Sequence, residues 1–169
     1  MTIDVVLRGE YQLWHGLEPG PALEELAARV GAIRVDAPQR QVRIATTYSV
    51  YTIQRATAPV RLDAWSPLGS GRISIVEIDD PVCTGIERVL DEMGEPEAHL
   101  DDVRLSAEYF VTEFVFARRG IVLSVGTPLT PAGSRPRTLL HVRLFAPVTL
   151  QRYLTDIGEP TPSRPAVHD

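Results

Sequence analysis

Acid–base chemistry is the reaction type for which this sequence offers suitable side chains on predicted strands. Glu113 lies in a predicted strand over 107–117, and His141 lies in another over 138–145. A carboxylate and an imidazole within reach of one substrate can remove and return a proton without a cofactor. One hypothesis is therefore a small cofactor-free enzyme, such as a cyclase or an isomerase. It requires the sheet to curl around a cavity of at least roughly 300 Å³ that contains both side chains.

The same two residues belong to a larger set that strand alternation places on one face of the predicted sheet. Tyr, Trp and Arg anchor protein interfaces because they combine a large contact area with directed polar groups. This composition favours a partner-binding role for the face turned away from the predicted helices. An ordinary exposed sheet face with cross-strand pairs is the alternative interpretation. The candidate partner-binding residues are Arg43, Tyr51, Arg61, Trp65, Tyr109, Glu113, His141 and Arg143.

The segment after the second predicted helix is the most acidic neighbourhood of the chain. Glu95, Glu97, His99 and Asp101 stand at alternate positions, so an extended backbone directs them to one side. Such a comb has the ligand types of a divalent-cation site, but a solvated acidic loop explains the same pattern. We adopt the second interpretation and expect no metal. With Asp102, this acidic loop could meet a basic surface on a partner.

Motifs of the common cofactor-dependent and hydrolytic enzymes are missing. The sequence contains no Gly-x-Ser-x-Gly elbow, no His-Glu-x-x-His helix, no Cys-x-x-Cys pair and no dinucleotide-binding glycine fingerprint. Gly69-Ser70-Gly71 lacks the lysine and the following helix of a phosphate-binding loop. Cys83 is the single cysteine, so it forms no internal disulfide and supplies at most one zinc ligand. We therefore expect no cofactor.

Composition predicts one domain over residues 1–158, followed by an irregular proline-containing tail at 159–169. The chain has 169 residues and 44% hydrophobic content, enough for one substantial core. Its net charge is −5 and its 17 basic residues, all arginine, are scattered, so we expect no nucleic-acid partner. No apolar run approaches the roughly 20 residues that cross a bilayer. With one cysteine and no signal pattern, we expect a cytoplasmic bacterial protein.

Short amphipathic helices recur along the chain. Segments ending at Gly31, Gly94 and Gly158 place apolar residues at i, i+3, i+4 and i+7, and these glycines are 63 and 64 residues apart. A glycine in the left-handed conformation is expected to end each helix. Alternating apolar and β-branched residues predict the strands. These strands cover 2–7, 42–55, 60–65, 73–78, 107–117, 121–125 and 138–145.

Short connections between these strands favour antiparallel pairing. We predict an α+β fold in which three short helices cover one face of a mainly antiparallel sheet of about seven strands. A tandem β-α-β-β repeat of about 63 residues accounts for the order of elements. Its units are expected at about 1–72 and 73–136, with a closing strand and helix at 137–158.

One part of this order resembles a known family. A helix over 84–96 ends in Gly-x-Pro and is followed by an aromatic strand, a tight turn and a second strand through 110–125, with a partial second match at 149–160. This is similar to the repeat of beta-lactamase-inhibitor-protein-like domains and of small outer-membrane-assembly lipoproteins. The resemblance implies a binding scaffold, sometimes an inhibitor of another protein. Those families are exported and often disulfide-bonded or lipidated, whereas this chain shows no signal and one cysteine.

Three functions therefore remain open. The first is a protein-binding module, for instance an immunity or inhibitor protein that acts through the sheet face and the acidic loop. The second is a structural or assembly component that forms homo-oligomers through an edge strand, because unpaired edges invite strand addition. The third is the cofactor-free enzyme built on Glu113 and His141.

Overall fold

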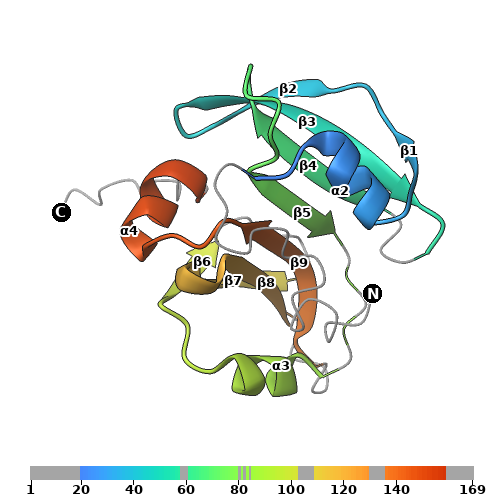
Figure 1. The fold of residues 1–169 in the computed structure, drawn as a ribbon. Helices are drawn as coiled ribbons and strands as arrows, with labels where there is room; N and C mark the ends of the chain where they lie inside the picture. The colour runs from blue at the N-terminus through green and yellow to red at the C-terminus, as the bar shows by residue number, and fades with distance from the viewer. Residues whose placement is uncertain are drawn as a thin grey trace.

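Nine antiparallel strands and three short helices make up the residues that this computed structural model describes, namely 20–57, 61–79, 81, 83, 85–102, 109–129 and 136–158 (Figure 1). The predicted α+β class and the antiparallel pairing are confirmed. The predicted strand over 2–7 and the tail over 159–169 lie outside the described residues. None of the described helices is long and apolar enough to cross a membrane.

The sheet consists of two runs of strands that meet at its centre. The first run follows helix α2 (Leu23–Arg29) and contains β1 (Ala32–Val35), β2 (Gln39–Arg43), β3 (Thr46–Arg55), β4 (Arg61–Pro67) and β5 (Ile75–Asp79). The second follows α3 (Ile86–Met93) and contains β6 (Ala98–Asp102), β7 (Tyr109–Phe116), β8 (Ile121–Pro128) and β9 (Thr138–Phe145). The order is β1-β3-β4-β5-β9-β8-β7-β6, and β2 pairs with another part of β3. The two runs therefore join where β5 pairs with β9.

The sequence pattern missed three of these strands. The predicted strand over 42–55 is really β2 and β3, separated by a two-residue turn at Ile44 and Ala45. Ile44 has a positive φ of 53°, which a β-branched residue rarely adopts, so its apolar side chain disguises the turn as strand. The strand β1 is a short edge strand with mostly exposed side chains, and it therefore shows no clear hydrophobic alternation. The edge strand β6 does alternate, with His99 and Asp101 exposed between Ala98 and Leu100, but its acidic composition favours a loop.

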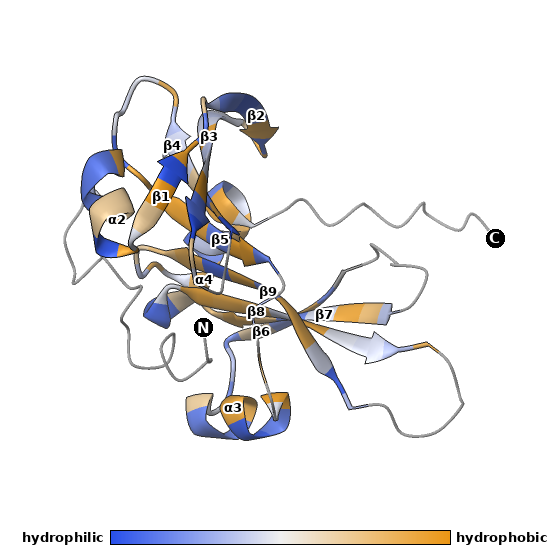
Figure 2. Cartoon of the chain, turned by 90° about the vertical axis from the view of Figure 1, so that its right-hand side faces the viewer, coloured by the Kyte–Doolittle hydropathy of each residue, from blue (hydrophilic) through white to orange (hydrophobic). Residues whose placement is uncertain are grey.

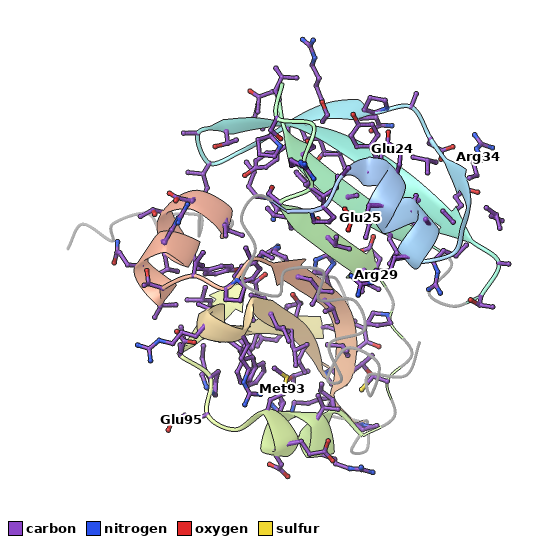
Figure 3. The ribbon with its side chains drawn as sticks, in the orientation of Figure 1. Glu24, Glu25, Arg29, Arg34, Met93 and Glu95 are labelled. Atoms are coloured by element: carbon purple, nitrogen blue, oxygen red, sulfur yellow. The ribbon has the colours of Figure 1, made fainter. Side chains whose placement is uncertain are left out.

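Helices α2 and α3 cover one face of the sheet, as their apolar stripes predict. Leu26 of α2 and Ile86, Val89 and Met93 of α3 are buried in one core cluster with side chains from β3, β4, β5, β7, β8 and β9. Figure 2 shows the hydrophobic colouring concentrated on the central strands. In Figure 3 the Met93 side chain lies between α3 and the sheet, whereas Glu24 lies on the outer side of α2. These two helices thus bury the apolar side chains whose spacing predicted them.

The third helical segment packs on the opposite face, so the prediction of three helices on one face is wrong. Helix α4 (Leu150–Arg152) continues into a π-helical turn, Tyr153–Ile157. Tyr153 is fully buried in a second core cluster and stacks on Phe145 with ring centroids 5.2 Å apart. Gly158 has a φ of −57°, not the left-handed value expected. Periodicity predicts that a stripe is buried, but it does not say against which face.

A left-handed glycine closes the turn between β7 and β8. Gly120 follows a short 3₁₀ turn over Ala117–Arg119 and has a φ of 69°. Its carbonyl accepts a hydrogen bond of 2.9 Å from the Phe145 amide, which draws β9 close. A Cβ atom on Gly120 would lie 2.0 Å from the Phe145 carbonyl oxygen. Both the backbone conformation and the close approach therefore require glycine here.

We expect Gly120→Ala to lower the free energy of unfolding by at least about 3 kcal/mol, because the positive φ and the backbone clash act together. Gly69→Ala is the matched control, since Gly69 has a φ of 82° but no atom within 4 Å of its added Cβ. That control should cost about 1 kcal/mol. Urea unfolding of both variants tests this. Equal losses would contradict the role of the close approach.

Candidate functional site

A polar recess of about 400 Å³ opens on the sheet face away from α2 and α3. Six strands contribute to its lining, because the alternating side chains of β2, β4, β5, β7, β8 and β9 point into it. Its volume exceeds the roughly 300 Å³ expected of an enzyme site and both Glu113 and His141 line it, but it is an open recess and not the buried cavity that the enzyme hypothesis requires. The polar and aromatic residues that line the recess are Gln41, Arg43, Asp63, Trp65, Glu77, Asp79, Glu113, Ser124, His141 and Arg143.

One row of cross-strand neighbours crosses the recess. Glu113 on β7 faces Ser124 on β8, Ser124 faces His141 on β9, and His141 faces Asp79 on β5. Adjacent strands lie about 4.8 Å apart, so the backbones of Glu113 and His141 are separated by about 10 Å. The small Ser124 side chain lies between the two longer ones. This spacing leaves room for a small molecule between the carboxyl group and the imidazole.

A buried carboxylate, Glu77, holds the cationic side of the recess together. Its Oε1 atom accepts hydrogen bonds from Arg43 Nη2 at 2.6 Å and from Arg143 Nε at 2.9 Å. Burial raises the pKa of Glu77, but His141 and the two guanidinium groups outweigh that effect and hold the pKa well below its usual range. Glu77 is therefore ionised at neutral pH. It joins β2, β5 and β9 through charge-assisted hydrogen bonds.

Glu113 is held in place from the helical side. Arg143 Nη1 donates to the Tyr153 hydroxyl at 2.9 Å, and that hydroxyl donates to Glu113 Oε2 at 3.4 Å. Arg143 Nη1 also lies 3.5 Å from Glu113 Oε1. Burial raises the pKa of Tyr153 to about 12, so the phenol keeps its proton. The longer contacts to Glu113 leave this carboxylate less tightly bound than Glu77.

His141 is held between two carboxylates. Its Nδ1 atom lies 2.9 Å from Asp79 Oδ1, and its Nε2 atom lies 3.6 Å from Glu77 Oε1, beyond hydrogen-bond distance. Burial lowers the pKa of His141, but Asp79 and Glu77 outweigh burial and raise the pKa above 6.5. The protonated form of the imidazole is therefore favoured more than in a free histidine, with Nδ1–H donating to Asp79. Nε2 has no hydrogen-bond partner among the described residues.

Trp65 presents an unpaired donor beside the same recess. The Arg43 guanidinium lies over the indole ring, 4.1 Å from its centroid, and Tyr48 packs edge-on against it. The indole Nε1–H is buried and finds no acceptor within the described part of the chain. A buried donor without a partner costs about 1–3 kcal/mol, so structures rarely keep one without a reason. A ligand oxygen at this position would satisfy it.

The structure brings together five of the eight residues predicted for the sheet face. Arg43, Trp65, Glu113, His141 and Arg143 line the recess, and four of them are buried rather than displayed on a flat surface. The remaining three lie elsewhere. Tyr51 packs against the opposite core cluster, Arg61 is exposed and pairs with Asp63, and Tyr109 lies farther along β7.

The predicted acidic loop is partly a strand. Asp101 and Asp102 lie in the edge strand β6, where Asp101 accepts a hydrogen bond from Thr112. Glu97 Oε1 accepts from the backbone amide of Arg118 at 2.8 Å, and Glu95 is exposed and directed away from the sheet (Figure 3). The described residues contain no group of three or more His, Cys, Asp or Glu side chains placed to hold a metal ion.

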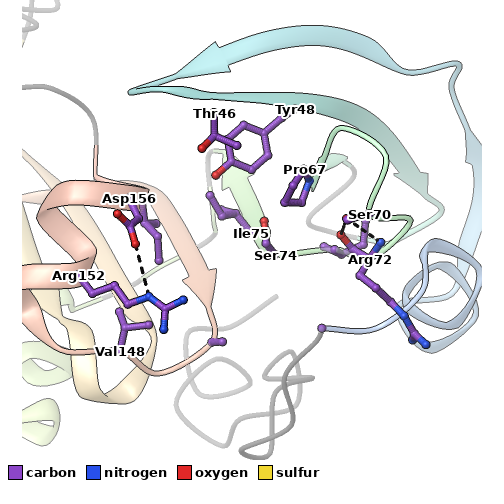
Figure 4. Close-up of a pocket in the computed structure, with 14 residues that line it drawn as sticks. Thr46, Tyr48, Pro67, Ser70, Arg72, Ser74, Ile75, Val148, Arg152 and Asp156 are labelled. Carbon is purple, nitrogen blue, oxygen red and sulfur yellow. Dashed lines mark hydrogen bonds and ion pairs between the residues drawn. The ribbon is translucent and has the colours of Figure 1, made fainter.

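A second, more apolar pocket of about 650 Å³ lies between the β4–β5 connection and α4 (Figure 4). Tyr48 and Ile75 line one side and Val148 lines the other, with an exposed ion pair of 3.4 Å between Arg152 and Asp156. Arg43 separates this pocket from the recess, since its Nη1 donates to the Ile157 carbonyl at 3.5 Å. The apolar pocket lacks a buried acid and base, so the recess remains the candidate site.

Comparison of the chain with protein-family models, with curated proteins and with solved structures finds no match.

Sequence reasoning missed Glu77, Asp79, Ser124 and Tyr153. A usable signal existed for Glu77, because it interrupts the evenly apolar predicted strand over 73–78. A carboxylate in such a strand is rarely buried unless it is paired. No comparable signal marked the others, because their roles depend on cross-strand neighbours and on the side of the sheet that α4 covers.

We expect Glu77→Gln to lower the free energy of unfolding by about 3–5 kcal/mol, because it leaves Arg43 and Arg143 buried without their shared counter-charge. Glu92→Gln is the matched control, since Glu92 pairs with Arg88 on the exposed side of α3. Loss of that i,i+4 pair should cost less than about 0.5 kcal/mol. Urea unfolding at neutral pH compares the two. A loss for Glu77→Gln as small as the control would contradict the central role of this carboxylate.

The raised pKa of His141 predicts a pH-dependent contribution to stability. A group whose folded-state pKa exceeds its unfolded value of 6.5 stabilises the fold fully below that pH. The contribution is lost as the pH rises from 6.5 through the folded-state pKa of His141. The difference in unfolding free energy between wild type and His141→Gln should therefore shrink across this window. Urea unfolding at a series of pH values measures it, and a difference that grows with pH would contradict the ion pair with Asp79.

Proposed function

We propose that this protein is a small cofactor-free enzyme that moves a proton on a substrate bound in the recess, as an isomerase or a cyclase does. The observation that carries the proposal is the row Glu113, Ser124, His141 and Asp79, which places a carboxylate and an oriented imidazole on one recess, on strands whose backbones lie about 10 Å apart. Ion pairs lower the pKa of Glu77 and raise that of His141, and perturbed pKa values are frequent at functional sites.

In this proposal Glu113 is the base and His141 is the acid. Glu113 removes a proton from a carbon next to a carbonyl group, and the imidazolium Nε2–H donates to the carbonyl oxygen as negative charge develops there. Asp79 keeps the imidazole oriented by accepting from Nδ1–H. Return of the proton from Glu113 to another carbon, and of the oxygen's proton to His141, completes an isomerisation without any other reactant.

Nucleophilic catalysis by Ser124 has less support. Asp79 and His141 reproduce two members of a hydrolase triad, and Ser124 is the cross-strand neighbour of His141. However, His141 Nε2 makes no hydrogen bond to Ser124. Its raised pKa also favours the protonated ring, which cannot accept the serine proton. The site therefore fits general acid catalysis by His141 better.

A protein-binding module of the immunity or inhibitor type is the second candidate, and the strand order favours it. Each of α2 and α3 is followed by antiparallel strands that run from one edge to the β5–β9 junction, as a tandem repeat would produce. The exposed Glu95 and Asp101 would then meet a basic partner.

Homo-oligomerisation is a third candidate, supported by the exposed apolar residues Ile33 and Val42 on the edge strands.

Exchange of substrate protons with solvent tests the enzyme proposal without knowledge of the natural substrate. A panel of small ketones is incubated with the protein in D₂O, and the loss of α-proton signals is followed by NMR. We expect at least one ketone to exchange its α-protons faster with the wild-type protein than in buffer alone. Glu113→Gln should reduce the catalysed rate by about 10²–10⁴-fold, because it removes the base.

Glu95→Gln is the matched control, since Glu95 is exposed and lies outside the recess. It should leave the exchange rate unchanged. If no ketone exchanges faster with the wild type than with Glu113→Gln, the enzyme proposal fails and the protein-binding candidate takes its place, because that candidate predicts no catalysed exchange.

A further inference from the structure

We infer that the recess takes an uncharged polar molecule, held by hydrogen bonds to Trp65, Ser124 and His141 rather than by ion pairs. The inference names the ligand class of the same site and rests on the proposed function for what the site does with that ligand. The observation behind it is that the charged groups of the recess already have partners, whereas two hydrogen-bonding groups of the recess find none among the described residues.

The charges at the recess are already paired with each other. Its four carboxylates each lie near a cation of the chain, at distances of 2.6, 2.9, 2.9 and 3.5 Å. These pairs are Glu77 with Arg43, Asp63 with Arg61, Asp79 with His141, and Glu113 with Arg143. With His141 protonated, the four carboxylates are matched by three cations of the lining and by Arg61, which pairs with Asp63 from outside the recess. A ligand with a net charge would therefore enter without a counter-charge unless it broke one of these pairs.

The guanidinium groups are also the least accessible members of the set. The side chains of Arg43 and Arg143 are only 5% and 3% exposed, and both already donate to Glu77. An incoming carboxylate or phosphate would have to displace Glu77 from these donors. An incoming ammonium group would instead compete with Arg61 or His141 for Asp63 or Asp79. Either exchange would replace a short ion pair within the protein by an ion pair with the ligand, and would therefore add little binding free energy.

Three hydrogen-bonding groups, by contrast, remain available for a neutral ligand. Trp65 Nε1 and His141 Nε2 are buried and lack hydrogen-bond partners among the described residues, and the Ser124 hydroxyl also lines the recess. Trp65 is 7% exposed, so its donor is shielded from bulk water. A carbonyl or hydroxyl oxygen can accept from these donors, and a ligand hydroxyl can also donate to Ser124 Oγ. Unmade hydrogen bonds in a shielded site discriminate strongly between ligands that complete them and ligands that do not.

Three cyclohexane derivatives with a common 4-hydroxyl group separate these possibilities, because they differ mainly in charge. The probes are 4-hydroxycyclohexanone, which is neutral, trans-4-aminocyclohexanol, which is a cation, and trans-4-hydroxycyclohexanecarboxylate, which is an anion. Each is titrated into the full chain while the Trp65 indole ¹H–¹⁵N signal is followed by NMR, with Trp65→Phe used to assign that signal. We expect the neutral ketone to bind at least about tenfold more tightly than either ion. Its affinity should not change between low and high salt.

Ser124→Ala should weaken binding of the ketone by about threefold to tenfold, the effect of one lost hydrogen bond. Ser49→Ala is the matched control, because Ser49 lies on β3 outside the recess, and it should leave the affinity unchanged. Equal or tighter binding of the cation or the anion overturns the inference, as does absence of ketone binding. Binding is read independently of turnover: a bound ketone with no catalysed exchange refutes the enzyme proposal alone, and catalysed exchange with preferred binding of an ion refutes the inference alone.

Discussion

One buried carboxylate, Glu77, must be neutralised by neighbouring cations, and the rest of the site depends on this constraint. Glu77 lies on β5, at the junction of the two runs of strands, and its Oε1 atom accepts from arginines on β2 and on β9. A carboxylate at this depth is tolerable only because cations surround it. Arg43 in turn covers Trp65, and Arg143 reaches Tyr153 and Glu113. The shape of the recess therefore follows from how this single charge is neutralised.

The same strands build a hydrophobic core and a polar recess on one face. Toward α4, the side chains on this face are apolar, and Tyr153 seals them by stacking on Phe145. Toward the other end of the strands, no helix of the described residues lines the recess that contains the row from Glu113 to Asp79. Because α4 and its π-helical turn are short, they cover only the apolar part. The short helical segment is thus long enough to bury Phe145 and Tyr153 but too short to cover the recess.

This arrangement changes which function the predicted residues support. Aromatic and arginine side chains on a flat exposed face favour a protein interface, because such anchors must reach a partner's surface. Here Arg43, Trp65, Glu113 and Arg143 are buried and largely bonded to one another. All four line a space of small-molecule size, and the buried Trp65 indole N–H has no partner among the described residues. The exposed acidic edge and the symmetric strand order are what still favour a macromolecular partner.

The sequence by itself determined most of the elements and which side chains of each helix are buried. Alternation marked β4, β7 and β9, and i, i+3, i+4 spacing marked α2 and α3, because both periodicities are properties of a few neighbouring residues. It also selected Glu113 and His141. Only the tertiary structure decided that α4 covers the opposite face, that Ile44 turns the chain, and that Glu77 meets Arg143. Glu77 and Arg143 are 66 residues apart, and their contact exists only because β5 pairs with β9, a register that no local pattern encodes.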